Sequence, residues 1–339
     1  MTDSVDVLVI GGGQAGLAAS YRLTEAGVTH LVIDASARVG DSWRRRYDSL
    51  TLFTPRSLSA LPGFALRGDP NGYASRDEFA QYLEDYAARF SLPVRSGRRV
   101  ARLASDNEGS FTAALDTGAV SRAKAVLICT GPFQHPVVPT LAATLAPEVA
   151  QLTVASYTNP TGVPPGAVLV VGDGASGRDI AVDLTFTHRV LLATGKPRRL
   201  FPERILGQST WTWMDRLGLL GVSATSPIGR MMKAADPFPG RDRGLSALAG
   251  RGIDIRPRLV QVDGRQVVFA DGSTAEIDAV VWSVGYRDDW DWIDVPLDSP
   301  GLHFLGRPWQ RNRASALVLG AMRDSEPVVQ EMLSALIRA

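Results

Sequence analysis

Four residues near the N-terminus have the types and the spacing needed to bind a phosphate-containing ligand. Gly11, Gly13 and Gly16 occupy a G-x-G-x-x-G pattern, and Asp34 follows eighteen residues after Gly16. Glycines at this spacing let the chain turn sharply, let a pyrophosphate approach the backbone and let a helix pack closely on a strand. A carboxylate about twenty residues further on accepts a hydrogen bond from a ribose hydroxyl. The residues expected at this site are Gly11, Gly13, Gln14, Ala15, Gly16, Asp34 and Ala35.

The elements around this pattern are those that a dinucleotide site requires. Val5–Ile10 is mostly apolar and rich in β-branched residues, which predicts a strand buried on both faces. Leu17–Ala26 is predicted to be a helix that ends at Gly27, and His30–Ile33 to be a strand that leads into the acid. A glycine-rich turn in an ordinary α/β unit would explain the glycines but not Asp34, so we predict a dinucleotide site.

A second copy of the pattern lies in the middle of the chain. Ala167–Val171 has the composition of a buried strand, and Gly172–Gly177 (GDGASG) follows it. A helix from about Arg178 to Phe186 and a strand over Arg189–Ala193 come next. Because the motif recurs in the same strand-turn-helix context, we predict two nucleotide sites. The residues expected at the second site are Gly172, Gly174, Ala175, Ser176, Gly177, Lys196 and Arg198.

The side chains offer no other reaction chemistry. The four histidines are dispersed, and we find no Ser/His/Asp spacing and no metal-ligand cluster, so we expect no metal. The only cysteine, Cys129, excludes an internal disulfide, a CxxC redox pair and a cysteine-based zinc site. The reaction must then belong to a bound cofactor. With two dinucleotide sites, we expect FAD at the first and a nicotinamide cofactor at the second.

The turn after the second repeat indicates which nicotinamide cofactor binds. No acid follows Arg189–Ala193, and Thr194–Arg199 (TGKPRR) stands there instead. A carboxylate would repel a 2′-phosphate, whereas Lys196, Arg198 and Arg199 would neutralise one, which favours NADPH over NADH. A solvated basic turn explains any single one of these cations nearly as well, so NADH stays an alternative.

Composition sets further bounds on the protein. A length of 339 residues suggests two domains, and 36 basic against 35 acidic residues give no electrostatic case for nucleic acid or an anionic membrane. No apolar run approaches the length that spans a bilayer. We therefore expect a cytoplasmic protein that acts on a small molecule, and the sequence leaves homodimerisation open.

The rest of the chain alternates turns with short elements. Residues 35–75 form a turn-rich stretch that we expect to cover a ligand. Ser75 and Glu78 have the spacing of a capping box that opens a helix reaching about Phe90. Further expected elements are the strands Val94–Arg102, Ser110–Leu115, Ala119–Ala123 and Ala125–Thr130, and the helices Gln208–Leu219, Pro227–Ala234 and about Asp324–Ile337. Proline, glycine and threonine gather in Thr153–Pro165, where we expect a domain boundary.

These motifs resemble those of the flavin-containing monooxygenases (class B flavoprotein monooxygenases), in particular a compact bacterial branch, over nearly the whole chain. Gly11–Gly16 is similar to that family's FAD loop and Gly172–Gly177 to its NADPH loop. Val39–Arg44 resembles its G-G-x-W-R segment, Tyr47–Arg56 the stretch that wraps the flavin, and Val281–Arg287 its A-T-G-Y strand end. The resemblance implies cofactor contacts for Gly40, Ser42, Trp43, Leu52, Thr54, Val100, Thr130, Gly131, Gly285 and Gly306.

The resemblance also implies a fold and a reaction. We expect an α/β protein with two Rossmann-like dinucleotide-binding domains of the glutathione-reductase-like type, the NAD(P)H domain being inserted in the FAD domain. The expected FAD domain is discontinuous, with residues 1–158 and 286–339, and the NAD(P)H domain covers residues 159–285. The expected function is that of an NAD(P)H-consuming flavoprotein monooxygenase, which transfers one oxygen atom from O₂ to a heteroatom or carbonyl of a small molecule.

The chain departs from the family pattern at three places. Thr153 stands where the family fingerprint has a histidine, an asparagine that some members carry near Phe53 is absent, and Gly195 replaces an arginine of many relatives. The catalytic residues therefore stay unknown. Two alternatives remain, an NAD(P)H-dependent flavin reductase or oxidase that does not insert oxygen, and a cofactor-binding regulatory protein without turnover.

Overall fold

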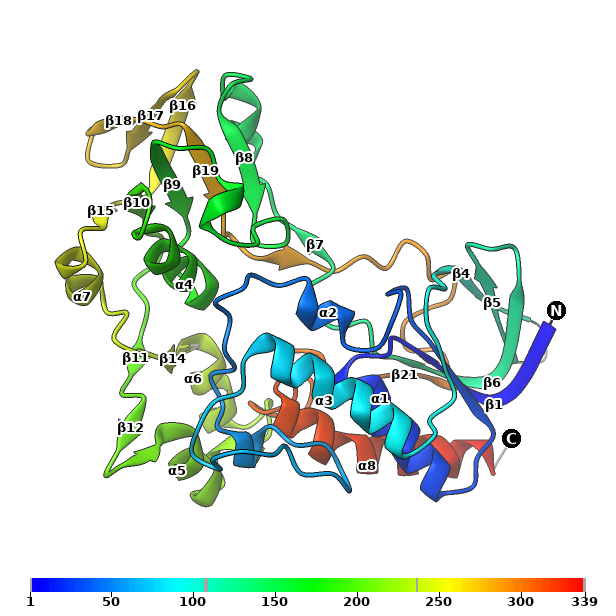
Figure 1. Cartoon of the computed structure of the whole chain (residues 1–339). Coiled ribbons are helices and arrows are strands. Elements are labelled where there is room, and N and C mark those ends of the chain that lie inside the picture. The colour runs from blue at the N-terminus through cyan, green and yellow to red at the C-terminus, as the bar shows by residue number, and fades with distance from the viewer. Residues whose placement is uncertain (1, 107–108, 236, 338–339) are drawn as a thin grey trace.

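Two β-sheets, each covered by helices and joined by extended segments, form the framework of this computed structural model (Figure 1). The structure describes residues 2–106, 109–235 and 237–337, so Met1 and Ala339, the ends of the predicted FAD domain, lie outside it. Each sheet contains a strand-glycine loop-helix unit followed by a parallel strand. The predicted α/β class with two Rossmann-like units is therefore confirmed.

The first sheet has the strand order β3-β2-β1-β6-β5-β4, and β21 pairs with β6 outside this path. Its strands are β1 (Thr2–Ile10), β2 (His30–Ile33), β3 (Val94–Arg95), β4 (Val100–Ser105), β5 (Phe111–Leu115), β6 (Val120–Ile128) and β21 (Leu302–Phe304). Val7 and Val9 of β1 pack against the helices α1 (Gln14–Glu25), α3 (Arg76–Arg89) and α8 (Val318–Leu336). Leu8 and Ile10 pack against β4 and β5, so β1 is buried on both faces, as predicted.

Two expectations for this sheet are corrected by the structure. The expected strands Ala119–Ala123 and Ala125–Thr130 are one strand, β6, which alternates buried and less buried side chains at first and is then buried on both faces. The change from alternating to continuous burial along β6 therefore led to the prediction of two strands where there is one. Conversely, the expected strand Val94–Arg102 is two strands, because Gly97, with a φ of 67°, turns the chain between them.

The second sheet is parallel throughout, with the order β15-β10-β9-β19-β8. Its strands are β8 (Ala150–Thr153), β9 (Ala167–Val171), β10 (Arg189–Ala193), β15 (Asp254–Arg256) and β19 (Ala279–Trp282). Helix α4 (Ala175–Leu184) packs on one face. The antiparallel strands β16 (Leu259–Asp263), β17 (Gln266–Phe269) and β18 (Thr274–Glu276) pack on the other face. Burial on both faces explains the unbroken apolar runs of β9 and β19.

The chain crosses between the sheets at the antiparallel pair β7 (His135–Pro136) and β20 (Tyr286–Arg287). After β7, the short helix η2 (Thr140–Thr144) and the residues that follow it join the core of the second sheet. Strand β8 then pairs with β19. The second sheet thus takes up residues that precede position 159, the expected start of its domain, whereas the expected end at 285 directly precedes β20.

The segment between β10 and β15 carries the remaining helices. Its elements are β11 (Leu200–Phe201), β12 (Arg204–Ile205), β13 (Gln208–Ser209), α5 (Thr210–Arg216), η4 (Leu219–Gly221), α6 (Pro227–Ala235), β14 (Phe238–Pro239) and α7 (Leu245–Gly250). The short helices α2 (Asp41–Arg44), η1 (Arg56–Leu58) and η3 (Pro160–Gly162) lie in the loops. Helix α5 is shorter than the expected Gln208–Leu219, because Ser209 caps it and Gly218, with a φ of 71°, follows it. Helix α8 begins at Val318 rather than Asp324, since its N-cap, Leu317, gives no side-chain signal.

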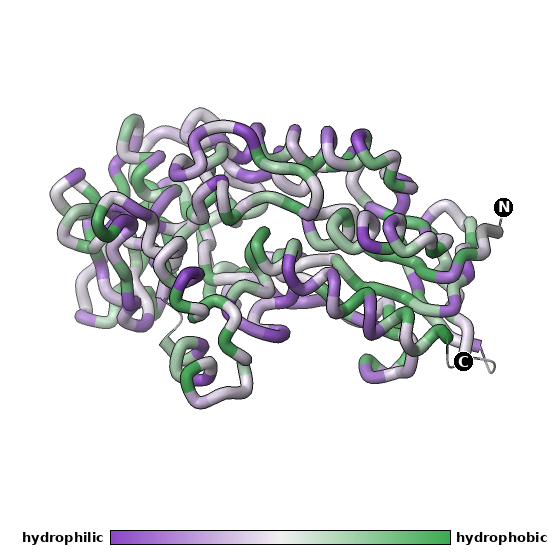
Figure 2. Tube along the Cα trace, turned by 90° about the horizontal axis from the view of Figure 1, so that it is seen from below, coloured by the Kyte–Doolittle hydropathy of each residue, from purple (hydrophilic) through white to green (hydrophobic). Residues whose placement is uncertain are grey.

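Helix α3 shows how local sequence fixes an element. The Ser75 hydroxyl accepts a hydrogen bond from the Glu78 N–H at 3.2 Å, and the Glu78 carboxylate accepts one from the Ser75 N–H at 2.7 Å. The predicted capping box is therefore confirmed. The apolar face of α3 is buried against α1. Burial of one face predicts that hydrophobic and hydrophilic residues alternate from turn to turn, and the helices in Figure 2 show this pattern.

Replacing Ser75 with alanine removes the acceptor for one N–H in the first turn of α3. We expect the variant to lose about 1 kcal/mol of unfolding free energy, measured by urea denaturation. Ser246→Ala, at an exposed position inside α7, is the control, and we expect a change of at most about 0.5 kcal/mol. Equal losses in the two variants would contradict a stabilising cap.

Candidate functional site

The first glycine loop turns from β1 into α1 with a geometry that requires glycine at two positions. Gly11 has a φ of 108°, and a Cβ there would lie 2.5 Å from the carbonyl oxygen of Cys129. A Cβ on Gly16 would collide with the carbonyl oxygen of Gly11, so α1 sits directly against the loop. Gly13, the N-cap of α1, faces open space, with nothing within 4 Å of an added Cβ and no side-chain cap on the helix. The first amides of α1 therefore point into open space, where a pyrophosphate can approach them.

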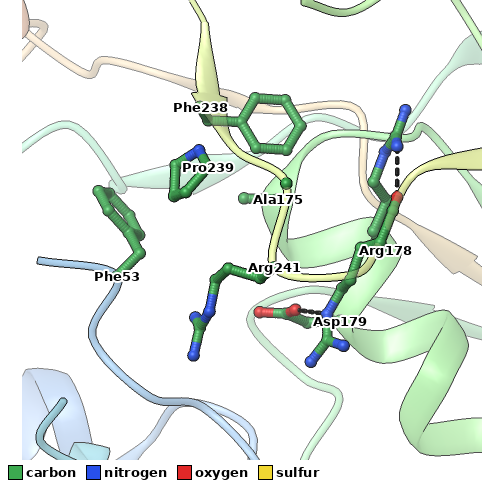
Figure 3. Close-up of a pocket in the computed structure, with 9 residues that line it drawn as sticks. Phe53, Ala175, Arg178, Asp179, Phe238, Pro239 and Arg241 are labelled. Atoms are coloured by element: carbon green, nitrogen blue, oxygen red, sulfur yellow. Dashed lines mark hydrogen bonds and ion pairs between the residues drawn. The ribbon is translucent and has the colours of Figure 1, made fainter. Parts of the chain in front are cut away.

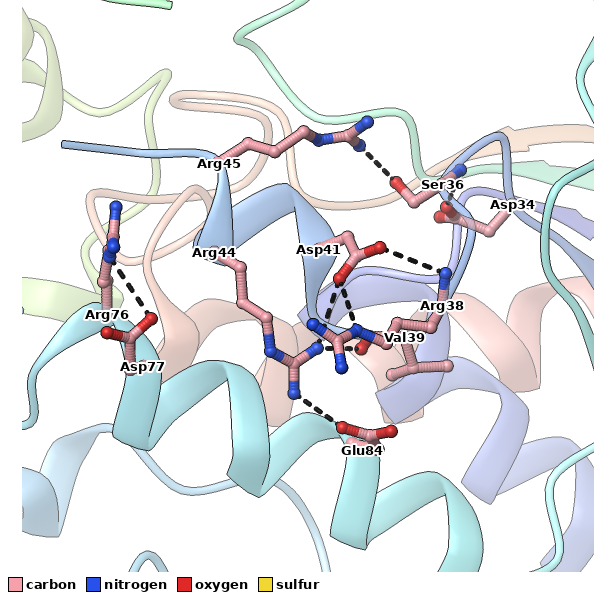
Figure 4. Close-up of polar contacts among 10 residues, drawn as sticks. All are labelled: Asp34, Ser36, Arg38, Val39, Asp41, Arg44, Arg45, Arg76, Asp77 and Glu84. Atoms are coloured by element: carbon pink, nitrogen blue, oxygen red, sulfur yellow. Dashed lines mark hydrogen bonds and ion pairs between the residues drawn. The ribbon is translucent and has the colours of Figure 1, made fainter. Parts of the chain in front are cut away.

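The acid of the first motif lies beside this loop. Asp34 follows β2, and its carboxylate accepts hydrogen bonds from the backbone N–H of Gly12 at 2.5 Å and of Ser36 at 2.6 Å. Arg45 donates to the Ser36 hydroxyl at 2.6 Å and brings a cation next to the acid (Figure 4). The predicted pairing of loop and acid is thus present in space, at the carboxyl edge of the first sheet.

An ion pair between Arg44 and Glu84 links helix α2 to α3 (Figure 4). Arg44 donates to Asp41 at 3.3 Å and to Glu84 of α3 at 2.6 Å. Although burial opposes the change, hydrogen bonds from Arg38 and Arg44 lower the pKa of the Asp41 carboxyl. Arg44 therefore has a structural role, whereas Arg45 points toward the acid of the first site.

Trp43 and Gly40 join this helix to the glycine loop and to α3. The Trp43 Nε1 donates to the Gln14 side chain at 3.2 Å, and its ring packs edge-on against Phe79 with centroids 4.8 Å apart. Gly40 has a φ of 86°, and a Cβ there would collide with the Ala80 carbonyl oxygen. The chain can therefore approach α3 closely only at a glycine.

Segments far apart in sequence close around the first loop. A Cβ on Gly306, which has a φ of 89°, would lie 3.0 Å from the Cβ of Ala15. Thr130 follows β6 and lies next to Gly11, and its hydroxyl accepts a hydrogen bond from Gln134 at 3.0 Å. The other predicted residues are the buried Leu52 and Thr54, the exposed Ala35 and Ser42, Gly131 with a φ of 70°, and Val100 at the start of β4. In the described part of the chain, no hydrogen bond joins Ser42, Leu52 or Val100 to this loop.

The second glycine loop repeats the first. Gly172 has a φ of 103°, and a Cβ there would collide with the Ser283 carbonyl oxygen. A Cβ on Gly177 would collide with the carbonyl oxygen of Gly172, and Gly174, the N-cap of α4, faces open space. Ala175 and Ser176 form the start of α4, and Gly285, with a φ of 102°, lies just beyond β19. The second loop therefore has open space at the same place as the first, at the N-cap of the following helix.

An acid inside the second loop is a site feature that the sequence analysis missed. The Asp173 carboxylate pairs with Arg178 at 2.8 Å, and the side chains of both are only 3% exposed. It also accepts a hydrogen bond from the Gly195 N–H at 3.2 Å, beyond the end of β10. Arg198 Nε lies 4.0 Å from the same carboxylate, and Lys196 is exposed on the same turn. The signal available in the sequence was an acid at the second position of the motif.

A pocket of about 20 Å³ lies where the first half of the fold, built around the first sheet, meets the second half, built around the second sheet (Figure 3). Its apolar wall has Phe53 from the first half and Phe238 and Pro239 from β14. The rest of the lining comes from the start of α4, with Arg178 and Asp179, and from Arg241 and Arg243 after β14. The pocket therefore joins the turn-rich stretch after β2 to the start of α4, next to the second glycine loop.

Thr153 ends β8 at the carboxyl edge of the second sheet. Its hydroxyl lies 3.3 Å from the Ser156 hydroxyl, and its N–H donates to the Ser156 hydroxyl at 2.9 Å. It pairs in register with Trp282 of β19, which separates it from β9 and the second glycine loop. The side chain thus closes its own turn, on the edge that carries the second site.

Open space at two helix N-termini, each at the carboxyl ends of parallel strands, is typical of a protein that binds two dinucleotides. Comparison with known proteins agrees. Residues 8–200 match the model of the pyridine nucleotide-disulphide oxidoreductases, and the chain belongs to that family. Within it, the predicted likeness to flavin-containing monooxygenases is confirmed.

Proteins that match nearly the full chain include an oxidoreductase and two monooxygenases. A CzcO-like oxidoreductase of Geobacillus kaustophilus is 41% identical over 98% of this chain and 100% of its own length. The indole-3-pyruvate monooxygenase YUCCA4 of rice, Oryza sativa subsp. japonica, is 27% identical over 99% of this chain and 89% of its own. The solved flavin-containing monooxygenase of Stenotrophomonas maltophilia is 26% identical, with a TM-score of 0.80 over 98% of this chain and 99% of its own.

Two further findings concern metal ions and membranes. No group of three or more His, Cys, Asp or Glu side chains in the described residues is placed to hold a metal ion. Among the helices of residues 2–106, 109–235 and 237–337, none is long and apolar enough to cross a bilayer.

Gly13→Val should give a folded protein that lacks FAD. The φ of Gly13 is −78° and an added Cβ meets no atom, so the apoprotein tolerates the side chain, which instead fills the space for the pyrophosphate. We expect a colourless variant whose circular dichroism spectrum matches that of the yellow wild type. The control is Gly174→Val, the same change in the second loop, which should keep the colour. A yellow Gly13→Val variant would contradict the assignment of the first loop.

Proposed function

We propose that this chain is an FAD- and NADPH-dependent monooxygenase that transfers one oxygen atom from O₂ to a heteroatom or carbonyl of a small molecule. One observation carries the proposal: both glycine loops have open space at the N-cap of the following helix, so that one chain can hold two dinucleotides. Support comes from relatives over nearly the full chain that are named as monooxygenases. A chain with one cysteine also lacks the CxxC pair of a thioredoxin-reductase-like enzyme.

In this proposal the first loop holds the ADP half of FAD. The amides at the start of α1 face the pyrophosphate, and Asp34 exchanges its backbone partners for a ribose hydroxyl. Trp43, Thr54 and Thr130 lie toward the flavin half. The remaining residues proposed around FAD are Gly11, Gly13, Gln14, Ala15, Gly16, Ala35, Gly40, Ser42, Leu52, Val100, Gly131 and Gly306.

The second loop holds the ADP half of NADPH in the same way. Lys196 and Arg198, exposed on the turn after β10, would meet its 2′-phosphate. The remaining residues proposed around NADPH are Gly172, Gly174, Ala175, Ser176, Gly177 and Gly285. The β7–β20 crossing supports a slightly larger NAD(P)H domain than the expected 159–285, with residues 137–285.

The chemistry is divided between cofactor and protein. When bound, FAD accepts a hydride from NADPH and reacts with O₂, which supplies the oxygen atom for the substrate. The chain itself positions the two dinucleotides and excludes water from the junction, where Tyr47 and Tyr157 are almost completely buried. The single, buried Cys129 supports a cytoplasmic location, where disulfides are rare.

A flavin reductase or oxidase is the second candidate. It is favoured by Thr153, whose hydroxyl is engaged with Ser156 and which stands in place of the family's histidine. The same loops would serve such an enzyme, so product analysis has to separate the two functions.

Labelled oxygen tests the proposal directly. FAD-loaded protein with NADPH, ¹⁸O₂ and a panel of amines, sulfides, ketones and 2-oxo acids should give a product with one labelled oxygen atom, detected by mass spectrometry. NADPH oxidation that yields hydrogen peroxide and no labelled product with any substrate class would assign the reductase or oxidase instead. Failure to oxidise NADPH at all would assign a regulatory protein.

Thr153 should make the enzyme poorly coupled. Threonine keeps a hydroxyl at this position but lacks the reach and the titratable proton of histidine. We expect wild type to release appreciable hydrogen peroxide per NADPH even with a good substrate, and Thr153→His to reduce this ratio about twofold. Thr274→His, at an exposed position of β18, is the control and should leave the ratio unchanged. Tight coupling in wild type, or an equal leak in Thr153→His, would contradict a role for this position.

A further inference from the structure

The two glycine loops differ in where their carboxylate comes from. In the first repeat, β1 and β2 pair with Ile10 opposite Ile33. Gly12 lies two residues after Ile10, and Asp34 lies one residue after Ile33. In the second repeat β9 and β10 pair with Val171 opposite Ala193, which makes Asp173 the counterpart of Gly12 and Thr194 the counterpart of Asp34. In the first repeat the acid follows the second strand, whereas in the second repeat it lies in the glycine loop.

Both carboxylates nevertheless link the glycine loop of their repeat to the turn after its second strand. Asp34 reaches back to the N–H of Gly12 at 2.5 Å, and an added Cβ on Gly12 would lie 3.2 Å from its oxygen. Asp173 reaches forward to the N–H of Gly195 at 3.2 Å, next to the counterpart of Asp34. The turn Thr194–Arg199 has no acid in its own sequence, but the Asp173 carboxylate contacts it. This turn carries the residues expected to meet a 2′-phosphate.

The surroundings of Asp173 determine what its charge can do. Arg178 is fixed behind the loop, since its Nε donates to the Asp173 carbonyl oxygen at 2.8 Å and its Nη1 to the Arg243 carbonyl oxygen at 2.5 Å. Its positive charge is therefore offset by Asp173 and is not free to attract a phosphate. Arg198, with a side chain 40% exposed, lies within 4.0 Å of Asp173, so the carboxylate also engages a cation of the basic turn.

We propose that Asp173 is a specificity-determining residue of the second dinucleotide site, which weakens binding of a 2′-phosphate and lets NADH compete with NADPH. This inference rests on the proposed function, because it takes the second loop to be the nicotinamide-cofactor site. Asp173 opposes the 2′-phosphate through its own charge and through its hold on Arg178 and Arg198. The basic turn alone would favour NADPH more strongly than the complete site does.

The test isolates the 2′-phosphate from the rest of the cofactor. Adenosine 2′,5′-bisphosphate and 5′-AMP differ only in that group, and their dissociation constants are measured by calorimetry on FAD-loaded protein. We define the selectivity as the dissociation constant of 5′-AMP divided by that of the bisphosphate. Asp173→Asn keeps the shape of the side chain and removes its charge, and we expect it to raise the selectivity about tenfold.

Two further variants make the result specific. Asp263→Asn makes the same chemical change at an exposed position at the end of β16, outside the second glycine loop, and should leave the selectivity unchanged. The double variant Asp173→Asn with Arg178→Gln removes the buried pair as a unit, which avoids leaving an unpaired buried cation. Since it still releases Arg198, we expect its selectivity to lie between those of wild type and Asp173→Asn.

The outcomes separate this inference from the proposed function. A selectivity that stays within twofold of wild type, or falls, in both Asp173 variants overturns the role of Asp173 and leaves the dinucleotide assignment intact. An equal rise in selectivity in Asp263→Asn overturns it as well, because a general charge effect would then suffice. Wild-type protein that binds neither nucleotide overturns both. Steady-state kcat/KM values for NADPH and NADH should shift in the same ratio as the binding constants.

Discussion

The close packing of each first helix against its glycine loop is the constraint on which the rest of the structure depends. Gly16 and Gly177 lie so near the carbonyl oxygens of Gly11 and Gly172 that no side chain fits. This contact directs the first amides of α1 and α4 into open space at the carboxyl edge of their sheets, where phosphates are bound best. The parallel strands of each sheet hold these two helix ends at the sheet's carboxyl edge.

Much of this could be predicted because the signals are local. The strand-loop-helix order, Asp34 and the capping box at Ser75 each depend on residues close in sequence, and each is found where the pattern places it. The errors came where the environment changes within an element or where a signal is absent. Strand β6 passes from one-sided to two-sided burial, and α8 begins at a leucine that makes no side-chain cap.

Asp173 shows why part of the site escaped prediction. A search for an acid after the second strand finds none, since the relevant distance is spatial and not sequential. The carboxylate links the glycine loop and the turn from the opposite side, and its place follows only from the register of β9 and β10. Thr153 is a similar case, because its hydrogen bonds to Ser156 within one turn could not be read from its alignment with the family's histidine.

The two halves are held together through one face of α4. Asp179 and Asp183, four residues apart, lie on that face and accept hydrogen bonds from Tyr47 at 3.2 Å and Tyr157 at 2.7 Å. Tyr47 belongs to the stretch after β2, yet its ring packs in the core of the second sheet beside Tyr157. Burial raises the pKa of the Tyr47 hydroxyl first of all, and the nearby charge of Asp179 adds to this, so the proton that it donates stays in place. The hydrogen bond from Tyr47 therefore fixes α4, the helix of the second glycine loop, to a segment of the first half.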